Sequence, residues 1–143
     1  MKDIERAREI LETERAALVI VNQDQLLFSS SERGIKPLYL AITQLGSSLR
    51  GASIADRVVG RAAALLCQHV GIKELYSGVI SQSALEILAR GEVAFSYGRS
   101  CPYIKNREQT DLCPIEKMAQ DLDNAEILLG RIGEFLKKIA EKA

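Results

Sequence analysis

The spacing of apolar positions divides the first third of the chain into one helix, a hairpin and a second helix. Apolar residues of segment 2–14 recur at three and four positions between charges, which predicts an amphipathic helix. Two apolar runs, 16–21 and 26–28, flank a polar turn and predict a β-hairpin. Pro37 suits the first turn of a helix that Gly46 ends. The order so far is helix, strand, strand, helix.

The remaining chain alternates helical and strand patterns. Ser53 and Asp56 fit a capping box, in which each side chain bonds the other's backbone N–H, and predict a helix over 57–69. The further predicted elements are strand 75–80, helix 82–90 with Ser81 as its cap, strand 93–97, loop 98–112, and one long helix or two abutting helices over 114–141. A hairpin followed by strand–helix–strand units predicts a single α/β domain over 1–143, with a mixed sheet between two helical layers.

Composition and charge narrow the function classes. Lys and Arg total 19, as do Asp and Glu, and this balance argues against general nucleic-acid binding. No apolar run reaches the ~18 residues of a membrane helix, and the start lacks the apolar core of a signal peptide. We therefore expect a cytoplasmic protein with three reduced cysteines. The lone His69 fits the last turn of a helix better than it fits catalysis.

The segment 101–116 has the densest polar chemistry and no clean helical or strand period. Asn106, Arg107 and Asp111 could bind a ligand, or they could order the loop through bonds to nearby backbone. Cys101 and Cys113 have eleven residues between them, which is not a zinc-knuckle spacing. We interpret them as two unrelated loop cysteines and expect no metal.

Cys113 is the candidate nucleophile. It precedes Pro114 at a predicted helix start, where unpaired N–H groups would stabilise a thiolate. The carboxylate of Glu116 would oppose that effect, and no base is evident in the sequence. The alternative is a small structural cysteine before a favourable first-turn proline.

Several blocks in order resemble a known family: Gly34-Ile35-Lys36-Pro37-Leu38, Gly51-Ala52-Ser53, Val58-Val59-Gly60, Ser77-Gly78-Val79-Ile80-Ser81, Pro102-Tyr103-Ile104 and Cys113-Pro114. Because of these blocks, the chain resembles an uncharacterised bacterial and archaeal family with a cytidine deaminase-like fold. Such deaminases hold zinc with His-x-Glu or Cys-x-Glu at one helix start and Pro-Cys-x-x-Cys at the next. The matching positions here, 56–60 and 81–84, contain no His, Cys or Glu. The resemblance therefore implies the fold without zinc-dependent deamination, and we expect no cofactor.

Two function classes remain open, besides a purely structural partner-binding subunit. The first is a binding or regulatory module for a small polar or nucleotide-like ligand. Its site would use Ser53, Asp56 and Gly60 of one helix start and Asn106, Arg107 and Asp111 of the loop. The alternative is a cysteine-dependent transferase or sulfur-transfer accessory that uses Cys113. The apolar stripe of the last helix could cover the domain or pair with a second copy of the chain, and the fold resemblance favours a homodimer.

Overall fold

The computed structural model describes residues 1–106 and 108–142, which form five strands and six α-helices. The elements in chain order are α1 (Asp3–Thr13), β1 (Leu18–Asn22), β2 (Gln25–Ser30), α2 (Lys36–Leu45), a 3-10 turn (Gly46–Leu49), β3 (Ser53–Val59), α3 (Arg61–His69), β4 (Glu74–Ser81), α4 (Gln82–Ala89), β5 (Ala94–Cys101), α5 (Pro114–Ala119) and α6 (Ala125–Lys142).

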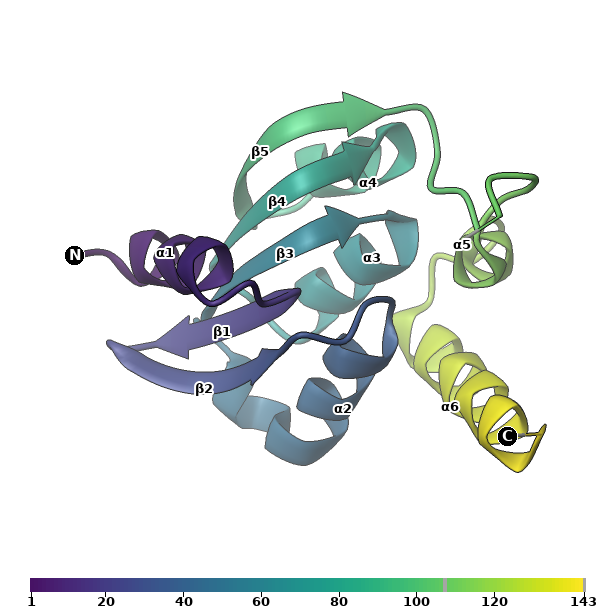
Figure 1. The fold of residues 1–143 in the computed structure, drawn as a ribbon, viewed down its shortest axis with the longest axis horizontal. Coiled ribbons are helices and arrows are strands. Elements are labelled where there is room, and N and C mark those ends of the chain that lie inside the picture. The colour runs from purple at the N-terminus through teal and green to yellow at the C-terminus, as the bar shows by residue number, and fades with distance from the viewer. Residues whose placement is uncertain (107, 143) are drawn as a thin grey trace.

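One mixed sheet runs through the middle of the domain in the order β2-β1-β3-β4-β5. The hairpin strands β1 and β2 are antiparallel, β1 is antiparallel to β3, and β3, β4 and β5 are parallel. Helix α1 covers one face, while α2, α3 and α4 cover the other (Figure 1). The predicted three-layer α/β class with a mixed sheet is confirmed.

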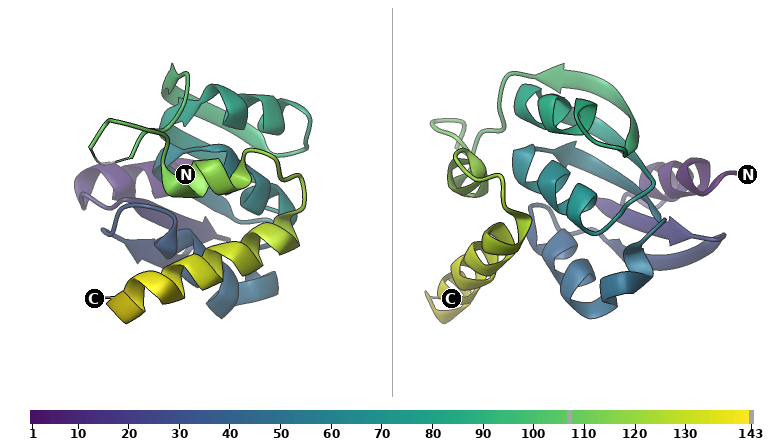
Figure 2. Two further views of the ribbon diagram at one scale, coloured as in Figure 1. Left: turned by 90° about the vertical axis from the view of Figure 1, so that its right-hand side faces the viewer. Right: turned by 180° about the vertical axis from the view of Figure 1, so that it is seen from behind.

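Helices α5 and α6 lie beside the edge of the sheet at which β3, β4 and β5 end (Figures 1 and 2). Of the two readings left open for segment 114–141, the structure has two helices separated by a short connection. No helix in the described ranges combines the length and the apolar character that crossing a membrane requires.

The apolar patterns that predict the helices also build two cores, one on each face of the sheet. The smaller core packs Ala7 and Leu11 of α1 on Val19 and Ala55 of the sheet. The larger core lies under the other helical layer and includes fully buried leucine and isoleucine side chains. Each such side chain contributes ~1.5–3 kcal/mol of burial free energy. The larger core extends to Leu128 and Ile132 of α6, so α6 is part of the domain.

The sequence prediction is wrong for the segment 53–59, which is strand β3. Ser53 is buried and pairs with residues of β1 and β4 rather than capping a helix. Burial of the first three residues within the sheet outweighs the local capping signal. Helix α3 begins at Arg61, after Gly60, so the sheet has one strand more than predicted.

Three neighbouring strands share an irregular row made of Arg57, Gly78 and Gly98. The pairing registers of β3 with β4 and of β4 with β5 omit this row. Ile54 and Val59, five positions apart, both belong to the larger core, so the inward–outward alternation shifts across the row. A Cβ at position 98 would lie 2.8 Å from the Gly78 carbonyl oxygen, which explains the glycine.

Candidate functional site

A carboxylate from α5 occupies the start of α3. Glu116 Oε1 accepts a hydrogen bond from the backbone N–H of Arg61 at 2.7 Å, and Oε2 accepts one from Ala62 at 3.1 Å. The first N–H groups of a helix have no partner within the helix and carry its positive dipole end. Glu116 therefore supplies acceptors to the first N–H groups of α3, although it lies 55 residues from Arg61 in the chain.

The close approach of Glu116 depends on Gly60. A Cβ at position 60 would lie 2.7 Å from Glu116 Oε2 and still closer to Oε1. Real Cβ atoms do not occur at such distances, so any other residue would displace the carboxylate. Contact with Glu116 is therefore sufficient to explain the glycine at position 60.

Arg61 fastens the connection between α5 and α6 to α3. Its Nε donates to the Ala119 carbonyl at 2.9 Å, and its Nη2 donates to the Leu122 carbonyl at 3.0 Å. The same Nη2 contacts Asp123 Oδ1 at 2.6 Å, and the Arg61 side chain is only 16% exposed. Hydrogen bonds of a charged donor are the stronger kind, so Arg61 and Glu116 together hold α5 in place.

A cavity of about 160 Å³ lies between these elements, at the carboxyl ends of the parallel strands. Its lining residues are Arg61, Ser81, Ser83, Pro102, Tyr103, Leu112, Glu116 and Gln120. Open α/β sheets commonly bind ligands in crevices outside the carboxyl ends of their strands. We call this cavity the edge pocket.

Ser81 positions the helical side of the edge pocket. It is the N-cap of α4, and its Oγ accepts a hydrogen bond from the Ala84 N–H at 3.1 Å, as the sequence predicts for this serine. The Ser81 hydroxyl can also donate one hydrogen bond. Ser83 lies in the first turn of α4, and Tyr103 supplies an aromatic wall that is half exposed.

The three residues predicted to form one helix start are spread along β3. Ser53 begins the strand, Asp56 is in its middle, and Gly60 follows its end. A strand rises about 3.3 Å per residue, so Ser53 and Gly60 lie far apart. Only Gly60 reaches the edge pocket region, through its contact with Glu116.

Asp56 is a carboxyl group beside the larger core. It pairs with Leu18 of β1 and Ser77 of β4, and its Oδ1 accepts from the Val58 N–H at 3.3 Å across the irregular row. Desolvation by burial raises the pKa of Asp56 to about 7, against the lowering effect of the hydrogen bonds from Val58 and Arg57. The neighbouring Ser77 donates to the Val79 carbonyl at 2.6 Å, so both side chains brace the same irregular row.

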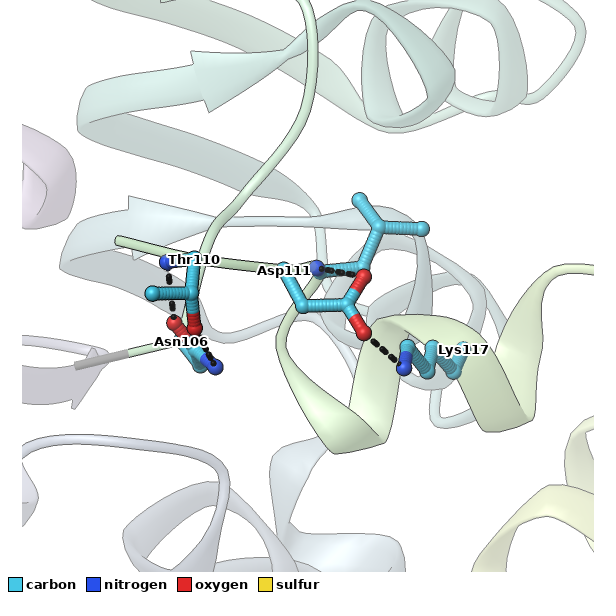
Figure 3. Close-up of polar contacts among 5 residues, drawn as sticks. Asn106, Thr110, Asp111 and Lys117 are labelled. Atoms are coloured by element: carbon cyan, nitrogen blue, oxygen red, sulfur yellow. Dashed lines mark hydrogen bonds and ion pairs between the residues drawn. The ribbon is translucent and has the colours of Figure 1, made fainter. Parts of the chain in front are cut away.

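The loop residues Asn106 and Asp111 bind close neighbours in the chain (Figure 3). Asn106 Oδ1 accepts from the Thr110 N–H at 3.1 Å, and Asp111 pairs with Lys117 of α5. The hydrogen bond from Lys117 is the main cause that lowers the pKa of Asp111. These contacts favour the loop-ordering interpretation, while Arg107, the third predicted loop residue, lies outside the described residues.

The three cysteines have different environments. Cys113 is the N-cap of α5 and is partly exposed, but α5 has only six residues, so its dipole is small. Cys101 ends β5, and burial is the main cause that raises the pKa of its thiol. Cys67 is buried in α3, where burial raises the pKa of its thiol and the charge of Asp56 adds to the effect.

A second, larger hollow of about 450 Å³ lies at the other end of α3. It is lined by Leu65, Gln68, His69, Asp123, Asn124, Ala125 and Glu126. Three of its polar side chains already have protein partners: Gln68 donates to Ile87, Asn124 accepts from Ile127, and Asp123 pairs with Arg61. This hollow lies away from the carboxyl ends of the strands, so we place the candidate site in the edge pocket.

The residues at the two helix starts do not fit the zinc site of the deaminases. Helix α3 begins with Gly60, Arg61 and Ala62, and α4 begins with Ser81 and Gln82. None of these supplies a thiolate, imidazole or carboxylate ligand. Across residues 1–106 and 108–142, no three His, Cys, Asp or Glu side chains gather closely enough to hold a metal ion.

The fold and the edge pocket define an α/β domain with a small pocket at the carboxyl ends of its parallel strands. The chain belongs to the TM1506 family, a domain of unknown function (DUF1893) that matches residues 6–136. The DUF1893 protein TM1506 of Thermotoga maritima is 25% identical, with a TM-score of 0.84 over 94% of this chain and 90% of that one. The predicted family resemblance is confirmed.

Two further solved structures are similar at lower levels. Acinetobacter baumannii RibD is 16% identical with a TM-score of 0.49, over 67% of this chain and 35% of that one. A dCMP deaminase from the cyanophage S-TIM5 is 10% identical with a TM-score of 0.48, over 69% and 94%. At these scores the two likenesses carry no argument about this chain. Among curated proteins, none matches this sequence.

Four residues that line the edge pocket were not predicted from the sequence as site residues: Arg61, Ser83, Tyr103 and Gln120. The sequence places the Glu116 carboxylate beside Cys113 at the start of the predicted last helix, whereas the structure places it on α3. The Gly60-Arg61 step could have indicated Arg61, because a glycine between a strand and a helix often marks close backbone contact. That signal was hidden by the assignment of β3 to a helix.

Proposed function

We propose that this protein is a binding or regulatory module for a small polar ligand, no larger than a nucleobase, held in the edge pocket. The observation that carries the proposal is the cavity itself, which lies at the carboxyl ends of β3, β4 and β5 and is lined by two helix starts and by residues of segments 102–103 and 112–120. Ligand clefts of drug size span ~300–1,000 Å³. A cavity of about 160 Å³ favours a nucleobase-sized group over an entire nucleotide.

The lining supports a planar polar ligand. Tyr103, Pro102 and Leu112 supply apolar and aromatic surface on which a flat ring could stack. Ser81, Ser83 and Gln120 supply hydroxyl and amide groups that can donate and accept hydrogen bonds. A few polar groups within a largely apolar wall fix a ligand's orientation.

The proposal is tested by ¹H–¹⁵N NMR titration with free nucleobases and nucleosides. Binding in the edge pocket should shift the backbone amides of Ser83, Tyr103 and Gln120. Ser83→Leu fills the cavity and should abolish these shifts, whereas Gln82→Leu, at an exposed neighbouring position outside the lining, should keep them. If no compound shifts the pocket amides, or if Ser83→Leu binds as the wild type does, the proposal is wrong.

Cysteine-dependent chemistry at Cys113 is the alternative proposal. Cys113 is partly exposed and lies next to Leu112 of the edge pocket lining. Helix α5 is too short to activate a thiolate strongly, and the Glu116 carboxylate binds α3. The contacts of the described residues therefore favour the ligand-binding module.

A further inference from the structure

We propose that Glu116 makes the edge pocket selective for ligands that donate N–H groups, neutral or cationic, and closes it to anions. This inference rests on the proposed function, because it names the class of ligand that the same pocket takes. The start of a helix usually attracts anions. At the start of α3 we expect the opposite preference, for N–H donors over anions.

The anion position at the start of α3 is already filled. Glu116 presents both carboxylate oxygens to the N–H groups of Arg61 and Ala62, and the absent Cβ of Gly60 lets it come close. An anionic ligand would have to displace this carboxylate, or lie beside it and experience like-charge repulsion. Neither is favourable while α5 remains packed against α3.

The Glu116 carboxylate still has acceptor capacity. An ionised carboxylate accepts about four hydrogen bonds, and the protein supplies one N–H to each oxygen here. Glu116 also lines the edge pocket, so its remaining acceptor capacity is next to the cavity. A ligand N–H donor satisfies it, and a bond to a charged acceptor is of the stronger kind.

The positive charge in the lining does not reverse this selection. Arg61 is the basic residue among the lining residues, and its guanidinium binds Ala119, Leu122 and Asp123. The positive charge of Arg61 is thus paired with the carboxylate of Asp123 in the connection between α5 and α6. The N-cap Ser81 similarly satisfies one N–H of α4.

Acetamidine and acetate test the inference directly, because they share one shape and differ in charge and in donor or acceptor character. NMR titrations should show acetamidine binding at least about tenfold more tightly than acetate, with shifts at Ser83 and Gln120. Glu116→Gln keeps the size of the side chain and should remove the preference. The matched control Glu126→Gln, which changes an exposed acid of the other hollow, should leave it unchanged.

The outcomes separate the inference from the proposed function. If both compounds shift the pocket amides with equal affinity, the inference about selectivity is wrong, but the edge pocket is still a ligand site. If acetate binds more tightly and shifts the Arg61 and Ala62 amides most, it replaces Glu116 on α3, and the inference is also wrong. If neither these compounds nor the nucleobases shift the pocket amides, the proposed function itself fails.

Discussion

Replacement of Asp56 by asparagine should remove a pH-dependent cost of folding. The carboxyl group of Asp56 has a pKa raised from 3.8 to about 7, because burial disfavours its charged form. Between these pH values the folded state keeps a proton that the unfolded state has released. The free energy of unfolding therefore falls as pH rises through this window, and the loss is complete above pH 7.

The size of the effect follows from the shift. A difference of about three pKa units, at 1.36 kcal/mol per unit, gives on the order of 4 kcal/mol. Asparagine keeps an oxygen that can accept the hydrogen bond from Val58, and it carries no charge at any pH. Asp56→Asn should match the wild type near pH 4 and become more stable than it at pH 8.

Urea unfolding of both proteins at a series of pH values from 4 to 8 measures this difference. Subtraction of the two curves removes the contributions of the other titrating groups. Asp121→Asn, at an exposed position of the connection between α5 and α6, is the control and should show no such trend. A difference between wild type and Asp56→Asn that stays within ~1 kcal/mol across the range would refute the reasoning about burial.

Three further predictions concern the closure of α5 and the cysteines. Gly60→Ala should lower the free energy of unfolding in urea by ~1–3 kcal/mol and speed amide exchange in α5, because the added Cβ overlaps Glu116. The control Gly130→Ala, which places a Cβ in open space on α6, should have neither effect. Arg61→Gln should cost ~1.5–3 kcal/mol, while Arg131→Gln at an exposed position should cost far less, and equal costs would contradict the role of Arg61. Iodoacetamide should label Cys113 in the native protein before buried Cys67 and no faster than free cysteine; a faster rate would favour the cysteine-dependent alternative.

Local patterns sufficed for the elements whose periodicity is uninterrupted. The α1 stripe, the hairpin and the Ser81 cap follow from apolar spacing, turn residues and a serine before a helix, and the structure has all three. Strand β3 was not predicted, because it is buried only at its ends and carries Asp56 and Arg57 in between. A strand so mixed has neither the alternation nor the continuous apolar run that sequence reasoning depends on.

The site could be predicted only in part, since it depends on contacts between distant segments. Gly60 was singled out, but its reason is the Glu116 carboxylate, 56 residues further along the chain. Arg61 is also explained only by its partners in the connection between α5 and α6. No local pattern encodes such pairings, whereas Asn106 and Asp111 bind partners no more than six residues away in the chain. The homodimer and the cytoplasmic location remain predictions of the sequence.

A crystal structure of the protein soaked with an uncharged amino-substituted nucleobase would show whether the edge pocket binds N–H donors through Glu116. We expect ligand density in the edge pocket, stacked on Tyr103 and with an N–H group within hydrogen-bond distance of Glu116, while Glu116 keeps its bonds to Arg61 and Ala62. Density confined to the hollow beside His69, or a ligand bound on α3 in place of Glu116, would contradict both proposals for the edge pocket.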